Sequence, residues 1–170
     1  LPDDVDTYTE AQRGYYGVSL AYRAMLYLDM ARMYEYLPCD KTVGKDPTTG
    51  NDVTNLTVPI VKVGINEDEA RHNPRAHHSD MAAFIESDLM AALEHIDYLP
   101  EKFVDNTMPN KACVYGLLAR LYMWNEDYAQ AREYAHLAIE ESGLSPMDKD
   151  DWTNVKTGCN DIEKWMWGAT

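Results

Sequence analysis

Apolar side chains recur at steps of three and four residues in four segments of the chain, the spacing that places them on one face of an α-helix. The first predicted helix covers residues 12–36, and its apolar face consists of Tyr16, Leu20, Ala24, Tyr27, Ala31 and Tyr34. A second stripe of Leu26, Met30 and Met33 predicts that this helix is largely buried. Pro38 ends it, because proline cannot continue the helical hydrogen bonds.

Three more helices follow from the same periodicity. The second begins with Ser79 as its N-cap and runs to Leu99, just before a proline. The third covers residues 111–125 and carries almost no charge. The fourth starts at Asp127, which together with Gln130 has the pattern of a capping box, and stops at Gly143.

The segments between and after these helices are mostly polar. Residues 37–78 are predicted to be a long loop insertion, within which residues 56–63 have β-type composition. Pro59 limits that run to an edge strand or an extended segment. After Pro146 we expect coil with a short extended piece at the end. The pattern predicts a mainly all-α fold, with residues 1–170 forming a single domain.

Charge and composition exclude several classes of function. With a formal net charge of -14, the chain would repel phosphate backbones, so we expect no nucleic-acid partner. No run of about 18 apolar residues predicts a membrane span, and the first residues do not resemble a signal peptide. The cysteines at positions 39, 113 and 159 fit no zinc spacing and are expected to be buried or incidental thiols.

No motif indicates a catalytic centre, a metal site or a cofactor. The 29 carboxylates are spread along helix faces without a distinctive pairing, so we predict no enzyme activity. Residues 71–78 contain three histidines, but the predicted loop also holds two arginines and is expected to face solvent. Residues 46–52 lack the ligand rhythm of a calcium loop and are interpreted as turns.

Two kinds of candidate residue remain. Arg23 lies on a strongly apolar helix and Asp88 holds a similar place on the second, so we predict that they form a structural ion pair. For sugar binding, the candidates are aromatic residues whose ring face can cover the apolar side of a sugar. These candidates are Tyr36, Trp124 and Trp152, although packing in the core is the competing interpretation for each.

Residues 111–143 match the tetratricopeptide pattern, W-x2-L-G-x2-Y in one helix and A-x3-F in the next. The first set is filled by Tyr115, Leu118, Ala119 and Tyr122, and the second by Ala131 and Ala135. Small residues at 119 and 131 let the two helix axes approach closely. Ala135 departs from the pattern, which has an aromatic residue there.

Several short motifs then occur in one order, which is Tyr22-Arg23-Ala24, Val58-Pro59-Ile60, Ile85-x2-Asp88-Leu89-x2-Ala92, Leu117-Leu118-Ala119-Arg120-Leu121-Tyr122 and the closing Trp165-Met166-Trp167-Gly168. This order, over residues from about 12 to 168, resembles the SusD/RagB family of surface glycan-binding lipoproteins. Departures include Tyr22 in place of Leu and Glu35-Tyr36 where a glycine is common. Family members are longer, so the chain looks like an internal fragment.

The resemblance implies non-catalytic binding of an oligosaccharide or polysaccharide at the outer membrane of a Gram-negative cell. It also implies delivery to a TonB-dependent transporter, and membrane attachment only through a lipid anchor that this chain does not contain. A tetratricopeptide-type scaffold for a protein partner is the first alternative, and an all-α enzyme is the second. The first two predicted helices would then form another hairpin, split by the insertion.

Overall fold

The computed structural model describes residues 5–35, 44–100, 106–158 and 161–168. Its regular elements in these ranges are all helical, which confirms the predicted all-α class. The α-helices are α1 (Glu10–Tyr34), α2 (Glu67–Arg71), α3 (His78–His95), α4 (Lys111–Trp124), α5 (Tyr128–Ser142) and α6 (Lys149–Trp152). Short 3-10 helices cover Val5–Thr7 (η1), Ile96–Tyr98 (η2) and Ile162–Lys164 (η5).

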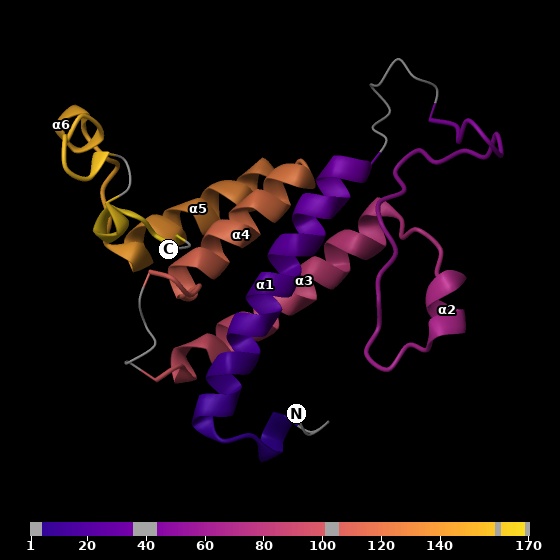
Figure 1. The fold of residues 1–170 in the computed structure, drawn as a ribbon, viewed down its shortest axis with the longest axis horizontal. Helices are drawn as coiled ribbons and strands as arrows, with labels where there is room; N and C mark the ends of the chain where they lie inside the picture. The colour runs from indigo at the N-terminus through magenta and orange to yellow at the C-terminus, as the bar shows by residue number, and fades with distance from the viewer. Residues whose placement is uncertain (1–4, 36–43, 101–105, 159–160, 169–170) are drawn as a thin grey trace.

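Helices α1 and α3 pack side by side as an antiparallel pair (Figure 1). The end of α1 meets the start of α3, where Glu35 bonds to His78, and the start of α1 lies against η2 and Leu99. Their facing sides form most of the core, which includes the fully buried Leu28, Met81, Ile85 and Leu89. The predicted pairing of the first two helices is therefore confirmed.

Glycine is required where α1 crosses η2. A Cβ atom on Gly14 would lie 2.5 Å from the Leu99 Cα, and one on Gly17 would lie 2.8 Å from the Ile96 nitrogen. Real Cβ atoms do not approach backbone this closely, so a side chain at either position would push the two segments apart. The two glycines thus fix how deeply the start of α1 sinks against the end of α3.

Helices α4 and α5 form a second antiparallel hairpin, with α4 lying between α5 and α1 (Figure 1). Asn110 caps α4 by accepting a hydrogen bond from the Cys113 N–H, and Asp127 caps α5 by accepting from Gln130. Only this half of the predicted capping box forms. Gly143 ends α5 with φ at 61°, the left-handed conformation that favours glycine.

The predicted ion pair connects the two helices of the first hairpin. The Arg23 guanidinium donates to both carboxylate oxygens of Asp88, each at 2.7 Å. The Asp88 side chain is 7% exposed and that of Arg23 is 38% exposed. The hydrogen bond that the Arg23 guanidinium donates to Asp88 raises the pKa of Arg23. A two-point contact of this kind compensates a carboxylate that would otherwise be buried alone.

The stripe formed by Leu26, Met30 and Met33 is exposed, with exposed fractions of 54%, 37% and 72%. The prediction that the first helix is largely buried is therefore wrong on this face. The cause is geometric, because α1 packs mainly against α3, η2 and α4, and these contacts leave the stripe uncovered.

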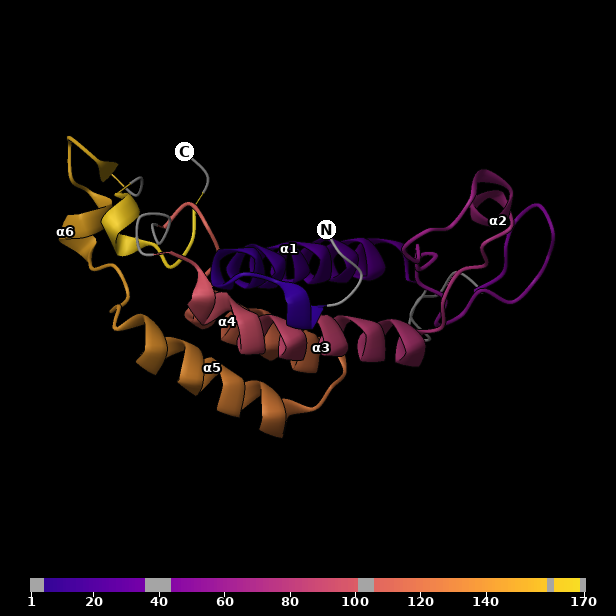
Figure 2. The ribbon, with the colours of Figure 1, turned by 90° about the horizontal axis from the view of Figure 1, so that it is seen from below.

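The described part of the insertion, residues 44–77, projects from the end of the first hairpin (Figure 2). Residues 56–62 form an extended segment and not a regular strand, since Leu56 pairs with His77 only as an isolated bridge, and Val63 lies in a turn. Arg75 fastens this segment by donating to the carbonyls of Thr57, Tyr34 and Leu56. The N-cap of α3 is His77, not Ser79, which lies inside the helix.

Two short α-helices were not predicted. Helix α2 lies in a segment interpreted as loop, and α6 lies in a segment interpreted as coil. Both begin with a complete capping box, formed by Asn66 with Glu69 and by Asp148 with Asp151. Their sequences carry no buried side chain, so the apolar periodicity that reveals longer helices is missing.

The segment 165–168 returns to the helices. The Trp167 ring packs edge-on against Tyr22 at 5.2 Å, and the Gly168 N–H donates to the Asn106 carbonyl at 2.8 Å. The free thiol of Cys113 contacts the Met166 carbonyl at 3.3 Å, and burial raises the pKa of this thiol. Cys39 and Cys159 lie outside the described residues.

Candidate ligand-binding groove

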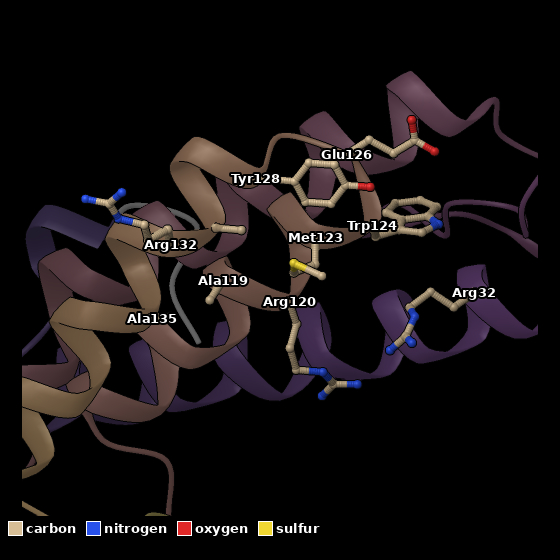
Figure 3. A pocket seen from close by; sticks show the side chains of 10 residues that line it. Arg32, Ala119, Arg120, Met123, Trp124, Glu126, Tyr128, Arg132 and Ala135 are labelled. Atoms are coloured by element: carbon tan, nitrogen blue, oxygen red, sulfur yellow. The ribbon is translucent and has the colours of Figure 1, made fainter.

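An open groove of about 720 Å³ lies between the last turns of α1, the second half of α4 and the first half of α5 (Figure 3). It is lined by Arg32, Ala119, Arg120, Met123, Trp124, Glu126, Tyr128, Ala131, Arg132 and Ala135. Its size falls within the range of small-molecule sites in proteins, which hold a few polar groups among apolar ones. We therefore define this groove as the candidate site.

Small residues make room for the groove. Ala119 on α4 and Ala131 and Ala135 on α5 all line it, and the absence of larger side chains leaves space between the helices. Ala135 stands where the tetratricopeptide pattern has an aromatic residue, so the departure seen in the sequence falls within this site. A phenyl ring at position 135 would occupy part of the volume.

Exposed apolar side chains stand at the mouth of the groove. Tyr128, the first residue of α5, is 62% exposed, and Met123 near the end of α4 is 56% exposed. Figure 3 shows both at the α4–α5 turn, above the gap that leads towards α1. A tyrosine ring and a methionine side chain in this position offer a surface for the apolar face of a ligand.

Three arginines line the same groove, one from each helix. Arg120 on α4 donates to the Asp29 carboxylate on α1 at 2.6 Å. In the view of Figure 3 the guanidinium groups of Arg32 and Arg120 face each other between α1 and α4, whereas that of Arg132 points away from them. Within the described residues, neither Arg32 nor Arg132 forms a hydrogen bond or an ion pair through its side chain.

Trp124 is held in place by a buried polar cluster at the end of the groove. Its indole N–H donates to Glu35 at 2.8 Å, and its ring lies 3.9 Å from that of His78. His78 bonds to Glu35 through Nδ1 at 2.6 Å and to Asn125 through Nε2 at 3.1 Å. The Glu35 side chain is only 2% exposed. The cluster ties the ends of α1 and α4 to the start of α3, which fixes one wall of the groove.

The scan against protein-family models finds no match, and no curated protein matches. Solved structures do match. A SusD-like carbohydrate binding protein from Bacteroides vulgatus ATCC 8482 superposes with a TM-score of 0.70 at 24% identity, over 95% of this chain and 31% of that chain. The chain has a SusD-like fold.

Two further solved structures agree with this fold. A candidate sugar-binding protein from the same organism gives a TM-score of 0.65 at 26% identity, over 96% of this chain and 34% of that chain. A SusD-like protein from Bacteroides fragilis NCTC 9343 gives 0.66 at 16% identity, over 95% of this chain and 28% of that chain. The chain thus spans about a third of the length of the SusD-like structures it matches.

Of the three predicted sugar-binding residues, Trp124 and Trp152 lie in the described part of this SusD-like fold, and they do not share one site. Trp124 lines the groove, but its N–H is already bonded to Glu35. Trp152 is 60% exposed on α6, beyond the C-terminal end of α5 (Figure 1), whereas the groove uses the first half of α5. Tyr36 lies outside the described residues.

Polar side chains of residues 71–78 and 46–52 have hydrogen-bond partners within the chain. His72 bonds to the Asp68 carbonyl, His77 to Ser79 and His78 to Glu35, so the three rings serve different contacts. Asp46 accepts from the N–H groups of Thr48 and Thr49, and these two bonds lower the pKa of its carboxyl. Across the described ranges, no group of three or more potential ligands is arranged for a metal ion.

Proposed function

We propose that this chain binds glycans without catalysing a reaction, as part of a surface protein that captures oligosaccharides or polysaccharides. The observation that carries the proposal is the SusD-like fold, which matches a carbohydrate binding protein over 95% of the chain. Fold alone does not define a ligand. The open groove supplies the local support, because it combines exposed apolar surface with hydrogen-bond donors.

The chemistry of the groove suits a sugar. A pyranose ring has an apolar face of C–H groups, and the Tyr128 ring is exposed at the right place to cover it. The hydroxyl groups of the same sugar need donors, which the arginine side chains at the groove supply. Trp124 is fixed by Glu35 and His78, so the wall beside this surface is formed before a ligand arrives.

The resemblance to SusD-like proteins extends the proposal to the fate of the ligand. We propose that the bound glycan passes to a TonB-dependent transporter of the outer membrane and that a lipid anchor holds the whole protein at the cell surface. In the described residues, no helix combines the length and the apolar composition needed to cross a bilayer. Co-purification of the tagged protein with a transporter from outer membranes would test the delivery step.

Affinity electrophoresis of the chain in gels that contain diverse polysaccharides tests the binding step. We expect retention by at least one polysaccharide, and weaker retention of the Tyr128→Ala variant. Trp152→Ala is the matched control, because it removes an equally exposed aromatic ring from α6, which lies outside the groove. No retention by any polysaccharide would contradict glycan binding, and loss of retention only in Trp152→Ala would place the site elsewhere.

A protein-binding scaffold is the second candidate function, and the exposed stripe of Leu26, Met30 and Met33 favours it. These residues lie on the outer side of α1, at the spacing of an amphipathic helix that packs on another element. If the stripe binds a partner, charged substitutions there will abolish that complex without changing retention by polysaccharides. This outcome separates the two surfaces.

A further inference from the structure

We infer that the groove selects glycans that carry negative charge, and that a carboxylate such as that of a uronic acid residue binds at Arg32 and Arg120. The inference rests on the proposed glycan binding and names the class of sugar. Its basis is the juxtaposition of an exposed aromatic ring with guanidinium groups from two helices.

The sign of the charge in the groove is opposite to that of the chain. The whole chain has 29 acidic and 15 basic residues, whereas the charged residues that line the groove are three arginines and Glu126. A site for neutral sugars gains little from a concentration of positive charge in an otherwise acidic protein. An anionic ligand gains attraction in the groove and repulsion from most other surfaces.

The side chain of Asp29 positions Arg120, and helix α1 brings Arg32 to the same groove. Asp29 holds the Arg120 guanidinium against α1 at 2.6 Å, and Arg32 lies one turn further along the same helix. Asp29 offsets one of the two positive charges, and within the described residues no ion pair offsets that of Arg32. A planar guanidinium presents two parallel N–H donors, which match the two oxygens of a carboxylate.

The apolar side of the groove makes a glycan a better occupant than a small anion. Phosphate or sulfate alone would use the arginines and leave the exposed Tyr128 and Met123 without contact. An acidic sugar residue contacts the arginines and the apolar side chains together, because its carboxylate lies at the ring edge and its ring has an apolar face. An acidic peptide is the competing occupant, and the experiment below includes it.

Titration calorimetry with tetragalacturonic acid and with a neutral tetrasaccharide tests the inference. We expect the acidic ligand to bind at least about ten times more tightly, and Arg32→Gln to weaken its binding about ten-fold, because charge-assisted hydrogen bonds are strong. Arg71→Gln is the matched control, since it removes the same charge from α2, where Arg71 pairs with Glu67. A sulfated tetrasaccharide, measured in parallel, distinguishes carboxylate from sulfate recognition.

The outcomes separate this inference from the proposed function. If the neutral ligand binds as tightly as the acidic one and Arg32→Gln has no effect on either, charge selection is wrong while glycan binding stands. If poly-glutamate binds in an Arg32-dependent manner and no glycan binds, both are wrong. Arg32-dependent binding of tetragalacturonic acid that weakens as salt is raised supports the inference.

Discussion

The two helical hairpins use small residues for opposite purposes. In the first hairpin, Gly14 and Gly17 bring the α1 backbone against the segment that follows α3, and the contact leaves no room for a Cβ atom. In the second, Ala119, Ala131 and Ala135 line an open groove of about 720 Å³. The glycines therefore allow backbone contact inside the first hairpin, whereas the alanines line a groove beside the second.

The difference lies in what faces the small side chains. Gly14 and Gly17 face backbone of the same hairpin, so contact is complete on both sides. The alanines of the second hairpin face a space bounded by α1 on one side, and the groove is left between the helices. The first hairpin then serves as the support, and the second carries the surface that can accept a ligand.

The largest expected loss of stability comes from breaking the ion pair of the first hairpin. Arg23→Glu would leave the buried Asp88 carboxylate opposite a like charge, and we expect a loss of about 2–4 kcal/mol in unfolding free energy. This range allows for the partial exposure of Arg23, because solvent screens the pair. Urea denaturation of Arg23→Glu, Asp88→Arg and the double variant measures the coupling. The double variant should recover part of the loss, and strictly additive losses would refute the pairing.

Gly14→Ala should destabilise the first hairpin by roughly 1–3 kcal/mol, because the added methyl group forces backbone apart. Gly116→Ala in α4 is the matched control. A Cβ there meets only the Met166 Sδ at 4.0 Å, so the helix should gain roughly 0.5–1 kcal/mol. Thermal and urea unfolding of the two variants measures both effects. Equal stabilisation by both alanines would show that the close contact at Gly14 does not exist.

The same contrast explains which parts of the fold were predictable. The start of α4 and the end of α5 at Gly143 were predicted within a residue, because caps and apolar periodicity are local in sequence. The Arg23–Asp88 contact was foreseen from burial, since a lone charge on an apolar helix needs a partner. The N-cap at His77 was missed, because Ser79 has the stronger intrinsic preference for that position.

The candidate site was much less predictable. Arg32 and Arg120 are 88 positions apart in the sequence, and only the packing of α1 against α4 brings them to one groove. In the sequence, Glu35 stands out only as a departure from the family pattern, yet in the structure it bonds to both Trp124 and His78. The one local signal was Ala135, where an aromatic residue was expected. Exposure of the outer stripe on α1 depends on what covers that face, which periodicity does not reveal.

A smaller effect is expected from pH at the second hairpin. Burial and the hydrogen bond to Glu86 raise the pKa of Tyr122, so the folded chain holds the phenolic proton more tightly than the unfolded chain. The contribution of the Tyr122 hydroxyl to the free energy of unfolding is fully present below the ordinary tyrosine pKa of about 10. It declines as the pH rises above that value. We expect a loss of about 1 kcal/mol by pH 11, and a shallower decline in Tyr122→Phe, measured by urea denaturation across pH. Parallel declines in both proteins would contradict the assignment to Tyr122.

The central claim is that the groove of the second hairpin holds the ligand, and filling the groove tests it most directly. The measurement is the affinity of Ala135→Phe for the polysaccharide that retains the unmodified chain. Ala129→Phe is the control, because Ala129 is exposed on the same helix but does not line the groove. We predict at least about a ten-fold loss for Ala135→Phe, or about 1.4 kcal/mol, and no change for Ala129→Phe. Unchanged affinity in a folded Ala135→Phe variant would contradict the claim.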